Sequence, residues 1–100
     1  MRTLFVVIRT KGSAWNTSKP LRQQAQWAEH ALFMDKLATD GFIILGGPLG
    51  DSGDILLVID APSESKVTTT LAEDPWSQSG ILEIKSIHLW QVLLEAGRKQ

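Results

Sequence analysis

Residues 42–59 read FIILGGPLGDSGDILLVI. Two apolar runs, Phe42–Leu45 and Ile55–Ile59, are each typical of a buried β-strand. The residues between them are rich in Gly, Asp and Ser, which is the composition of a turn between antiparallel strands. The stretch therefore predicts a β-hairpin near the centre of the chain, and the fold class follows from the elements on either side of it.

The elements before the hairpin are a strand, a loop and a helix. Leu4–Ile8 is a continuous apolar run, so we predict a buried first strand rather than a signal segment. Lys11–Pro20 contains Gly, Ser, Asn, Thr and Pro and is typical of a loop. The pattern from Leu21 to about Asp40 is helical, and Gly41 is a natural stop.

A second helix and a long strand follow the hairpin. Ser63 is a suitable N-cap for a helix that we expect to run to about Glu73. Pro75 cannot continue this helix in register, which places Asp74 at its end. Alternating and apolar residues over Ile81–Leu93 then predict the final strand.

The resulting order is βαββαβ, the order of a ferredoxin-like α+β fold. Right-handed crossovers place both helices on one face of a four-stranded antiparallel sheet. The first three strands are apolar at nearly every position, although an open antiparallel face normally alternates apolar with polar residues. Since the chain has no further element to cover the second face, we expect a homodimer with the two sheets face to face.

Composition places the chain among small globular domains. Its 100 residues predict a single domain over 1–100, with residues 95–100 as a polar tail that frays. A formal charge of −1 offers no basic excess for nucleic acid, and no run is long enough for a membrane span. The absence of cysteine removes thiolate chemistry and fits the cytoplasm, where we expect the protein.

The first predicted helix carries a histidine within its apolar stripe. At 100° per residue, His30 falls near the centre of an arc that also holds Trp27, Phe33, Met34, Leu37 and Ala38. On the second helix, Asp74 shares the inner face with Val67 and Leu71. A base and a carboxylate that face the same sheet can form a structural pair, or they can form a general acid–base pair. In the second case Asp74 accepts a hydrogen bond from one ring nitrogen and leaves the other nitrogen to move a proton.

Two further motifs are candidate pocket residues. Gly46, Gly47 and Pro48 either form a bend at a strand end or allow a ligand to approach the backbone near His30. Trp76 either plugs the edge of the sheet or forms an aromatic wall of a pocket. The two histidines have no spaced partners, so we expect no metal site.

Several short segments, in this order, resemble the YciI-like (YCII-related) family of small bacterial proteins. The segments are Phe5–Ile8, Glu29–Met34, Asp40–Phe42, Gly46–Leu49 and Glu73–Trp76, followed by a strand that Gly80 introduces. The resemblance implies a dimeric α+β barrel with a His-Asp pair, here His30 and Asp74, in a pocket near the Gly-Pro turn. One related enzyme type is a dehydrochlorinase of a chlorinated hydroxyquinol, and muconolactone isomerase shares the barrel fold. The long loop with Trp15 departs from typical members.

These observations lead to one main hypothesis and two alternatives. The main hypothesis is a cofactor-independent lyase or isomerase in which His30, oriented by Asp74, moves a proton of a small cyclic or aromatic metabolite. The reaction would be an elimination, an isomerisation or a dehydrochlorination. The first alternative is a dimeric module that binds a small molecule without changing it. In the second alternative the pair only stabilises the core, and replacing His30 by Leu is then tolerated.

Overall fold

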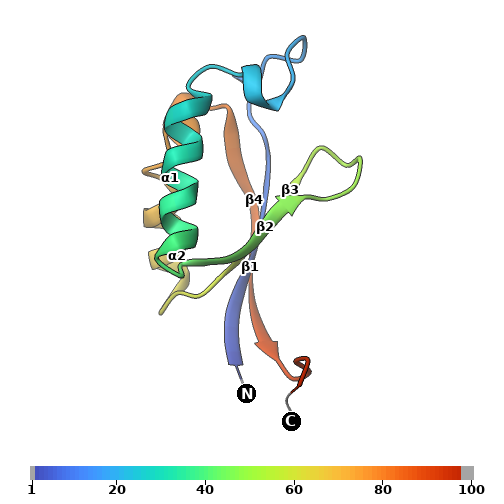
Figure 1. The fold of residues 1–100 in the computed structure, drawn as a ribbon, viewed down its shortest axis with the longest axis vertical. Helices are drawn as coiled ribbons and strands as arrows, with labels where there is room; N and C mark the ends of the chain where they lie inside the picture. Colours follow the sequence, from blue (N-terminus) through green and yellow to red (C-terminus); the bar gives the residue numbers. More distant parts are fainter. Residues whose placement is uncertain (1, 98–100) are drawn as a thin grey trace.

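The computed structural model describes residues 2–97 and shows a four-stranded antiparallel sheet with helices against one face (Figure 1). The strands lie in the spatial order β2-β3-β1-β4. Their bounds are Arg2–Lys11 for β1, Ile43–Pro48 for β2, Ile55–Ile59 for β3 and Leu82–Val92 for β4. This order and the hairpin between β2 and β3 confirm the ferredoxin-like α+β prediction.

Three α-helices and one short 3₁₀ turn complete the fold. The α-helices are α1 (Trp27–Thr39), α2 (Glu64–Leu71) and α3 (Pro75–Ser79), and the 3₁₀ turn η1 spans Leu21–Gln23. Figure 1 shows α1 and α2 on the same side of the sheet. The two expected helices are therefore present, and the five-residue helix α3 is an addition that the sequence pattern did not indicate.

The predicted start of the first helix at Leu21 is wrong, because α1 begins at Trp27. Gln26 has a φ of +60°, in the left-handed region, so the backbone cannot continue as one helix through it. Gln24 is buried and its side-chain amide bonds to loop backbone at Asn16 and Lys19 instead of pointing into solvent. These contacts hold the segment before α1 in a conformation that is not continuous with the helix.

The expected end of the second helix also needs correction. Ser63 caps α2 as predicted, since its hydroxyl accepts a hydrogen bond from the backbone N–H of Lys66 at 3.1 Å. The helix then ends at Leu71, and Pro75 opens α3 instead of ending α2. Asp74 is the N-cap of α3, and proline suits the first helical position because its missing N–H would be unpaired there.

Strand β2 is longer than predicted and includes Gly46, Gly47 and Pro48. The sequence indicated a bend at these residues, but they continue to pair with β3, with Gly47 opposite Leu56 and Pro48 opposite Ile55. Proline is compatible with this position because β2 lies at the edge of the sheet, where a missing N–H costs no ladder bond.

The helix-facing side of the sheet forms the main core. Phe5 and Val7 of β1 pack with Leu57 and Ile59 of β3, and the α2 residue Val67 closes over them. These residues are all buried, three of them completely. Burial of such residues is the main favourable term in the stability of a domain of this size.

The opposite face of the sheet carries a different set of side chains. By register, Leu4 lies opposite Trp90, and Val6 lies opposite both His88 and Val58. Trp90 is 44% exposed, and no helix within residues 2–97 covers this face (Figure 1). Glu95, in the expected tail, forms a β-bridge, while residues 98–100 lie outside the described part. Within residues 2–97 there is also no helix long and apolar enough to cross a bilayer.

The glycine pair of β2 offers a matched test of this packing. A Cβ at Gly46 would lie 2.8 Å from Cδ2 of the buried Leu57, whereas a Cβ at Gly47 would meet nothing within 4 Å. We expect Gly46→Ala to lower the free energy of unfolding by about 1–3 kcal/mol through overpacking. Gly47→Ala should leave it unchanged or raise it by up to about 1 kcal/mol. Urea denaturation of both variants measures the difference, and equal losses would contradict the assigned faces.

Candidate active site

The structure brings His30 and Asp74 together from different parts of the chain. His30 lies on α1 and is only 7% exposed. Its Nδ1 is 2.9 Å from each carboxylate oxygen of Asp74. The strand–helix order places both residues on the helix-facing side of the sheet, so the two candidates from the sequence form one contact.

Asp74 is held by its backbone position as well as by its partners. It is completely buried, and as the N-cap of α3 it accepts a hydrogen bond from the Trp76 backbone N–H at 2.9 Å. The guanidinium of Arg9 donates to its other oxygen, also at 2.9 Å. Together with His30, these donors satisfy a charge that would otherwise be costly to bury.

Arg9 is the main site residue that sequence analysis missed. It is 1% exposed on β1, donates from one terminal nitrogen to Asp74, and donates from the other to the Ser77 hydroxyl at 2.8 Å. Its Nε is the buried nitrogen left without a partner among residues 2–97. Strand alternation gave the signal, because residues 5, 7 and 9 share the face that carries the core.

Ser77 has a supporting position in the same network. Its hydroxyl donates to the Leu71 carbonyl at 2.7 Å while it accepts from Arg9. Because its proton is already directed at a backbone oxygen, Ser77 orients Arg9 and is not poised as a nucleophile.

The electrostatics of the site favour an ionised Asp74. Burial alone would raise the pKa of Asp74, but hydrogen bonds from His30, the Trp76 backbone and Arg9 outweigh it. The pKa of Asp74 consequently lies below its ordinary value. An ionised carboxylate accepts only, so the hydrogen bond at His30 Nδ1 is donated by the imidazole.

Trp76, for which the sequence left open a plug at the sheet edge or an aromatic wall of a pocket, is not among the residues that line the cavity described below. It is completely buried, and its indole stacks on the His30 ring at a centroid distance of 3.8 Å and an angle of 5°. Its Nε1 donates to the Ala25 carbonyl at 2.6 Å, which fixes the ring. Trp76 therefore lies behind His30 and restrains the plane of the imidazole.

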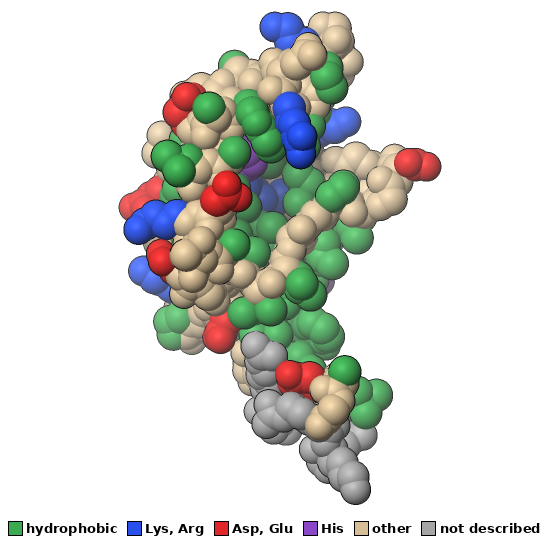
Figure 2. Space-filling model, in the orientation of Figure 1, with side chains coloured by type: hydrophobic (Ala, Val, Ile, Leu, Met, Phe, Trp, Pro, Cys, Tyr) green, Lys and Arg blue, Asp and Glu red, His purple; other side chains and the backbone are tan. Residues whose placement is uncertain are grey.

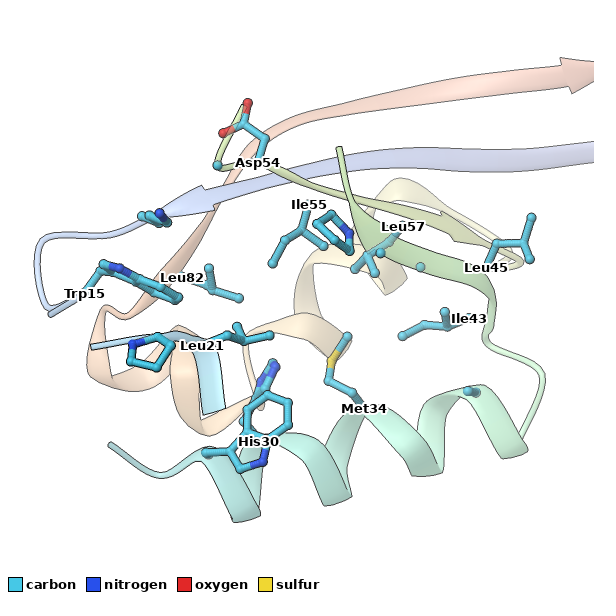
Figure 3. A pocket seen from close by; sticks show the side chains of 18 of the residues that line it. Trp15, Leu21, His30, Met34, Ile43, Leu45, Asp54, Ile55, Leu57 and Leu82 are labelled. Carbon is cyan, nitrogen blue, oxygen red and sulfur yellow. The ribbon is translucent and has the colours of Figure 1, made fainter. Parts of the chain in front are cut away.

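A cavity of about 690 Å³ lies between α1, the β2–β3 hairpin and the loop before α1. Figure 3 shows His30, Trp15 and Leu21 at one end of the cavity, with Ile43 and Leu45 at the other. Gly46, Gly47 and Pro48 line it along β2, so these predicted pocket residues do meet the cavity that His30 lines. Its size falls within the range of small-molecule sites.

The second nitrogen of His30 is available to this cavity. His30 lines the cavity, whereas its partner Asp74 is sealed behind it. No side chain or backbone group within the described residues hydrogen-bonds Nε2, and Nε2 is not closed off from solvent. The arrangement can take a proton at Nε2 or return one from it, while Nδ1 stays bonded to Asp74.

The ferredoxin-like α+β fold of this chain is shared by a solved enzyme structure. Among solved structures, the chain is similar to 5-chloro-2-hydroxyhydroquinone dehydrochlorinase (TftG) from Burkholderia phenoliruptrix AC1100, in complex with 2,5-dihydroxybenzoquinone. The TM-score is 0.52 at 20% sequence identity, and the match covers 89% of this chain and 92% of the other. No family model and no curated protein matches the chain. The similarity establishes the fold.

The lowered pKa of Asp74 has a consequence for acid stability. Because the folded-state pKa lies below the unfolded value of about 3.9, Asp74 stabilises the fold above that pH. This contribution is lost as the pH falls through the folded-state pKa. We expect Asp74→Asn to be less stable than wild type near pH 6, but to lose less stability between about pH 5 and about pH 2. Urea denaturation across that range is the measurement, and parallel pH profiles would contradict the assignment.

Proposed function

We propose that this protein is a cofactor-independent acid–base enzyme of the YciI-like type that acts on a small cyclic or aromatic metabolite. One observation carries the proposal: His30 has one nitrogen fixed on a buried carboxylate and the other free at the wall of a cavity. A core pair with a purely structural role gains nothing from leaving a ring nitrogen unpaired beside a cavity.

In the proposed reaction, neutral His30 takes a proton from the substrate at Nε2. The electron pair of the broken bond forms a new double bond, and either a leaving group such as chloride departs or the pair shifts to a carbonyl oxygen. The imidazolium then returns its proton to the isomerised product or to solvent. Asp74 stays ionised and donates no proton, so its role is to orient the ring and stabilise the imidazolium.

The shape and lining of the cavity support a ring-shaped substrate. Trp15 lies at the His30 end (Figure 3), and the ring of Trp27 lies 5.8 Å from that of His30 between centroids. Met34, Ile43 and Leu57 continue the apolar wall. The similar structure is that of a 5-chloro-2-hydroxyhydroquinone dehydrochlorinase and holds 2,5-dihydroxybenzoquinone, a compact six-membered ring. That ligand belongs to the other protein, and here it suggests which probes to try first.

Replacing His30 tests the proposal directly. We expect wild type to release chloride from 5-chloro-2-hydroxyhydroquinone, or to exchange ring protons of related quinols in D₂O as seen by NMR. His30→Gln should lower the rate by about 10²–10⁴-fold, because a positioned base contributes that much. Glu29→Gln, at an exposed neighbouring position on α1, is the matched control and should keep full activity.

The outcome of this experiment separates the alternatives. Equal rates for wild type and His30→Gln would refute the acid–base proposal, provided that circular dichroism shows both proteins folded. Binding of the quinols without turnover or exchange in wild type would favour a module that binds without catalysis.

We also propose that two copies associate through the open face of the sheet. Leu4, Val6, His88 and the 44% exposed Trp90 lie on this face. A face with several large apolar side chains is unusual for a monomer, and a second copy of the sheet is a self-complementary cover.

Trp90→Glu should convert the protein to a monomer without unfolding it, since Trp90 is 44% exposed in the single chain. A carboxylate buried within the proposed contact should weaken dimerisation about hundredfold or more. Leu32→Glu, at a 74% exposed site on the outer side of α1, is the control and should leave the mass unchanged. Light scattering at micromolar concentration measures both, and a monomeric wild type would disprove the dimer.

A further inference from the structure

The loop between β1 and α1 forms a fixed wall of the cavity. Gln24 is buried, and its side-chain amide bonds to the backbone of Asn16 at 2.9 and 2.8 Å and to the Lys19 carbonyl at 2.7 Å. At the start of the loop, the Gly12 N–H donates to the Ile81 carbonyl at 2.9 Å. The backbone of this loop is therefore held in place by the fold.

Trp15 connects this loop to the proposed catalytic histidine. Its ring lies edge-on to Trp76 at 6.1 Å, and Trp76 stacks on His30 at 3.8 Å. Trp15 also lines the cavity at the same end as His30 (Figure 3). A ring that approaches His30 would thus meet the indole of Trp15.

Lys11 places a positive charge at this end of the cavity. It is the last residue of β1, two positions beyond Arg9, so strand alternation puts its side chain on the same face as the Arg9–Asp74–His30 network. The ammonium lies 4.8 Å from the centroid of the Trp15 ring, a cation–π distance. A Cβ at Gly53 would lie 3.7 Å from the same nitrogen, so Lys11 stands between the loop and the β2–β3 turn.

The charges that line the cavity are not balanced at the His30 end. No carboxylate within residues 2–97 lies within ion-pair distance of Lys11 or Lys19, both of which line the cavity. Asp54 also lines it, but its charge is neutralised by Lys85 at 2.9 Å. The remaining acidic residue, Asp35, lies on α1 beyond the turn that holds His30. Figure 2 shows blue Lys and Arg side chains around the upper part of the hollow.

We propose that Lys11 binds an anionic group of the substrate, a carboxylate or a ring oxyanion, while the ring rests against Trp15. The substrate class is then a cyclic or aromatic acid, with its reacting atom presented to Nε2 of His30. This inference rests on the proposed function, because it takes the cavity as the substrate site. The charge would attract the anion and hold it in one orientation.

Two ligands that differ in one charge test this inference. We would titrate 2,5-dihydroxybenzoate and its amide, 2,5-dihydroxybenzamide, into wild type by calorimetry at low salt. Wild type should bind the acid about tenfold more tightly than the amide, which is the expected size of one charge-assisted hydrogen bond. Added salt should weaken the binding of the acid but not that of the amide.

Substitutions at Lys11 show whether this residue causes the preference for the acid. Lys11→Met keeps the alkyl chain and should bind acid and amide equally well, whereas Lys11→Arg should retain the preference for the acid. Lys66→Met removes an exposed lysine of α2 that does not line the cavity, and it should match wild type.

Two results with wild type would overturn the inference: no binding of the acid, or equal affinity for acid and amide. Two results with the variants would also overturn it: loss of the preference for the acid in Lys66→Met, or an equal loss of affinity for both ligands in Lys11→Met. The result is independent of the turnover experiment on His30. A charge preference that depends on Lys11, together with equal rates for wild type and His30→Gln, would refute the acid–base proposal and keep anion binding. Loss of turnover in His30→Gln without a charge preference would keep the acid–base proposal and refute anion binding by Lys11.

Discussion

The rest of the structure depends on a single buried carboxylate, Asp74. It has no exposed surface and accepts hydrogen bonds from Arg9 on β1, His30 on α1 and the Trp76 backbone on α3. An unpaired charge in such a place would cost several kcal/mol, so these three elements must dock together for the fold to form. The carboxylate therefore fixes the positions of α1 and α3 on the sheet, and the same hydrogen bonds fix the imidazole of His30.

These shared contacts explain why the His30–Asp74 pair can have a structural role and a functional role at the same time. The contacts that bury Asp74 leave His30 with a defined tautomer, because the ionised carboxylate accepts the proton at Nδ1. Trp76 restrains the ring plane from behind. Stability and preorganisation come from the same contacts, and of the two ring nitrogens of His30 it is Nε2 that has no hydrogen-bond partner among residues 2–97.

The sequence predicted the order of elements, the central hairpin and the His30–Asp74 pair, because apolar periodicity reports which face each residue occupies. It did not predict where α1 begins, since Gln24 was helical by pattern but bonds to the loop through its amide. The Asp74-Pro75 step was also ambiguous, because proline follows one helix and starts another with equal ease. Arg9 was missed because a charge after an apolar run resembles the end of a strand, whereas β1 continues to Lys11.

The residues that line the cavity are held in place in two different ways. His30 sits on α1 and is fixed by the core, whereas Trp15 and Lys19 belong to a loop whose shape comes from Gln24 and backbone contacts. Trp76 joins the two parts, since one edge meets Trp15 and one face meets His30. Changes in the loop can thus alter which ligand fits without disturbing the buried carboxylate. Under the proposed function, the core therefore determines the chemistry, and the loop, together with the end of β1, determines the substrate.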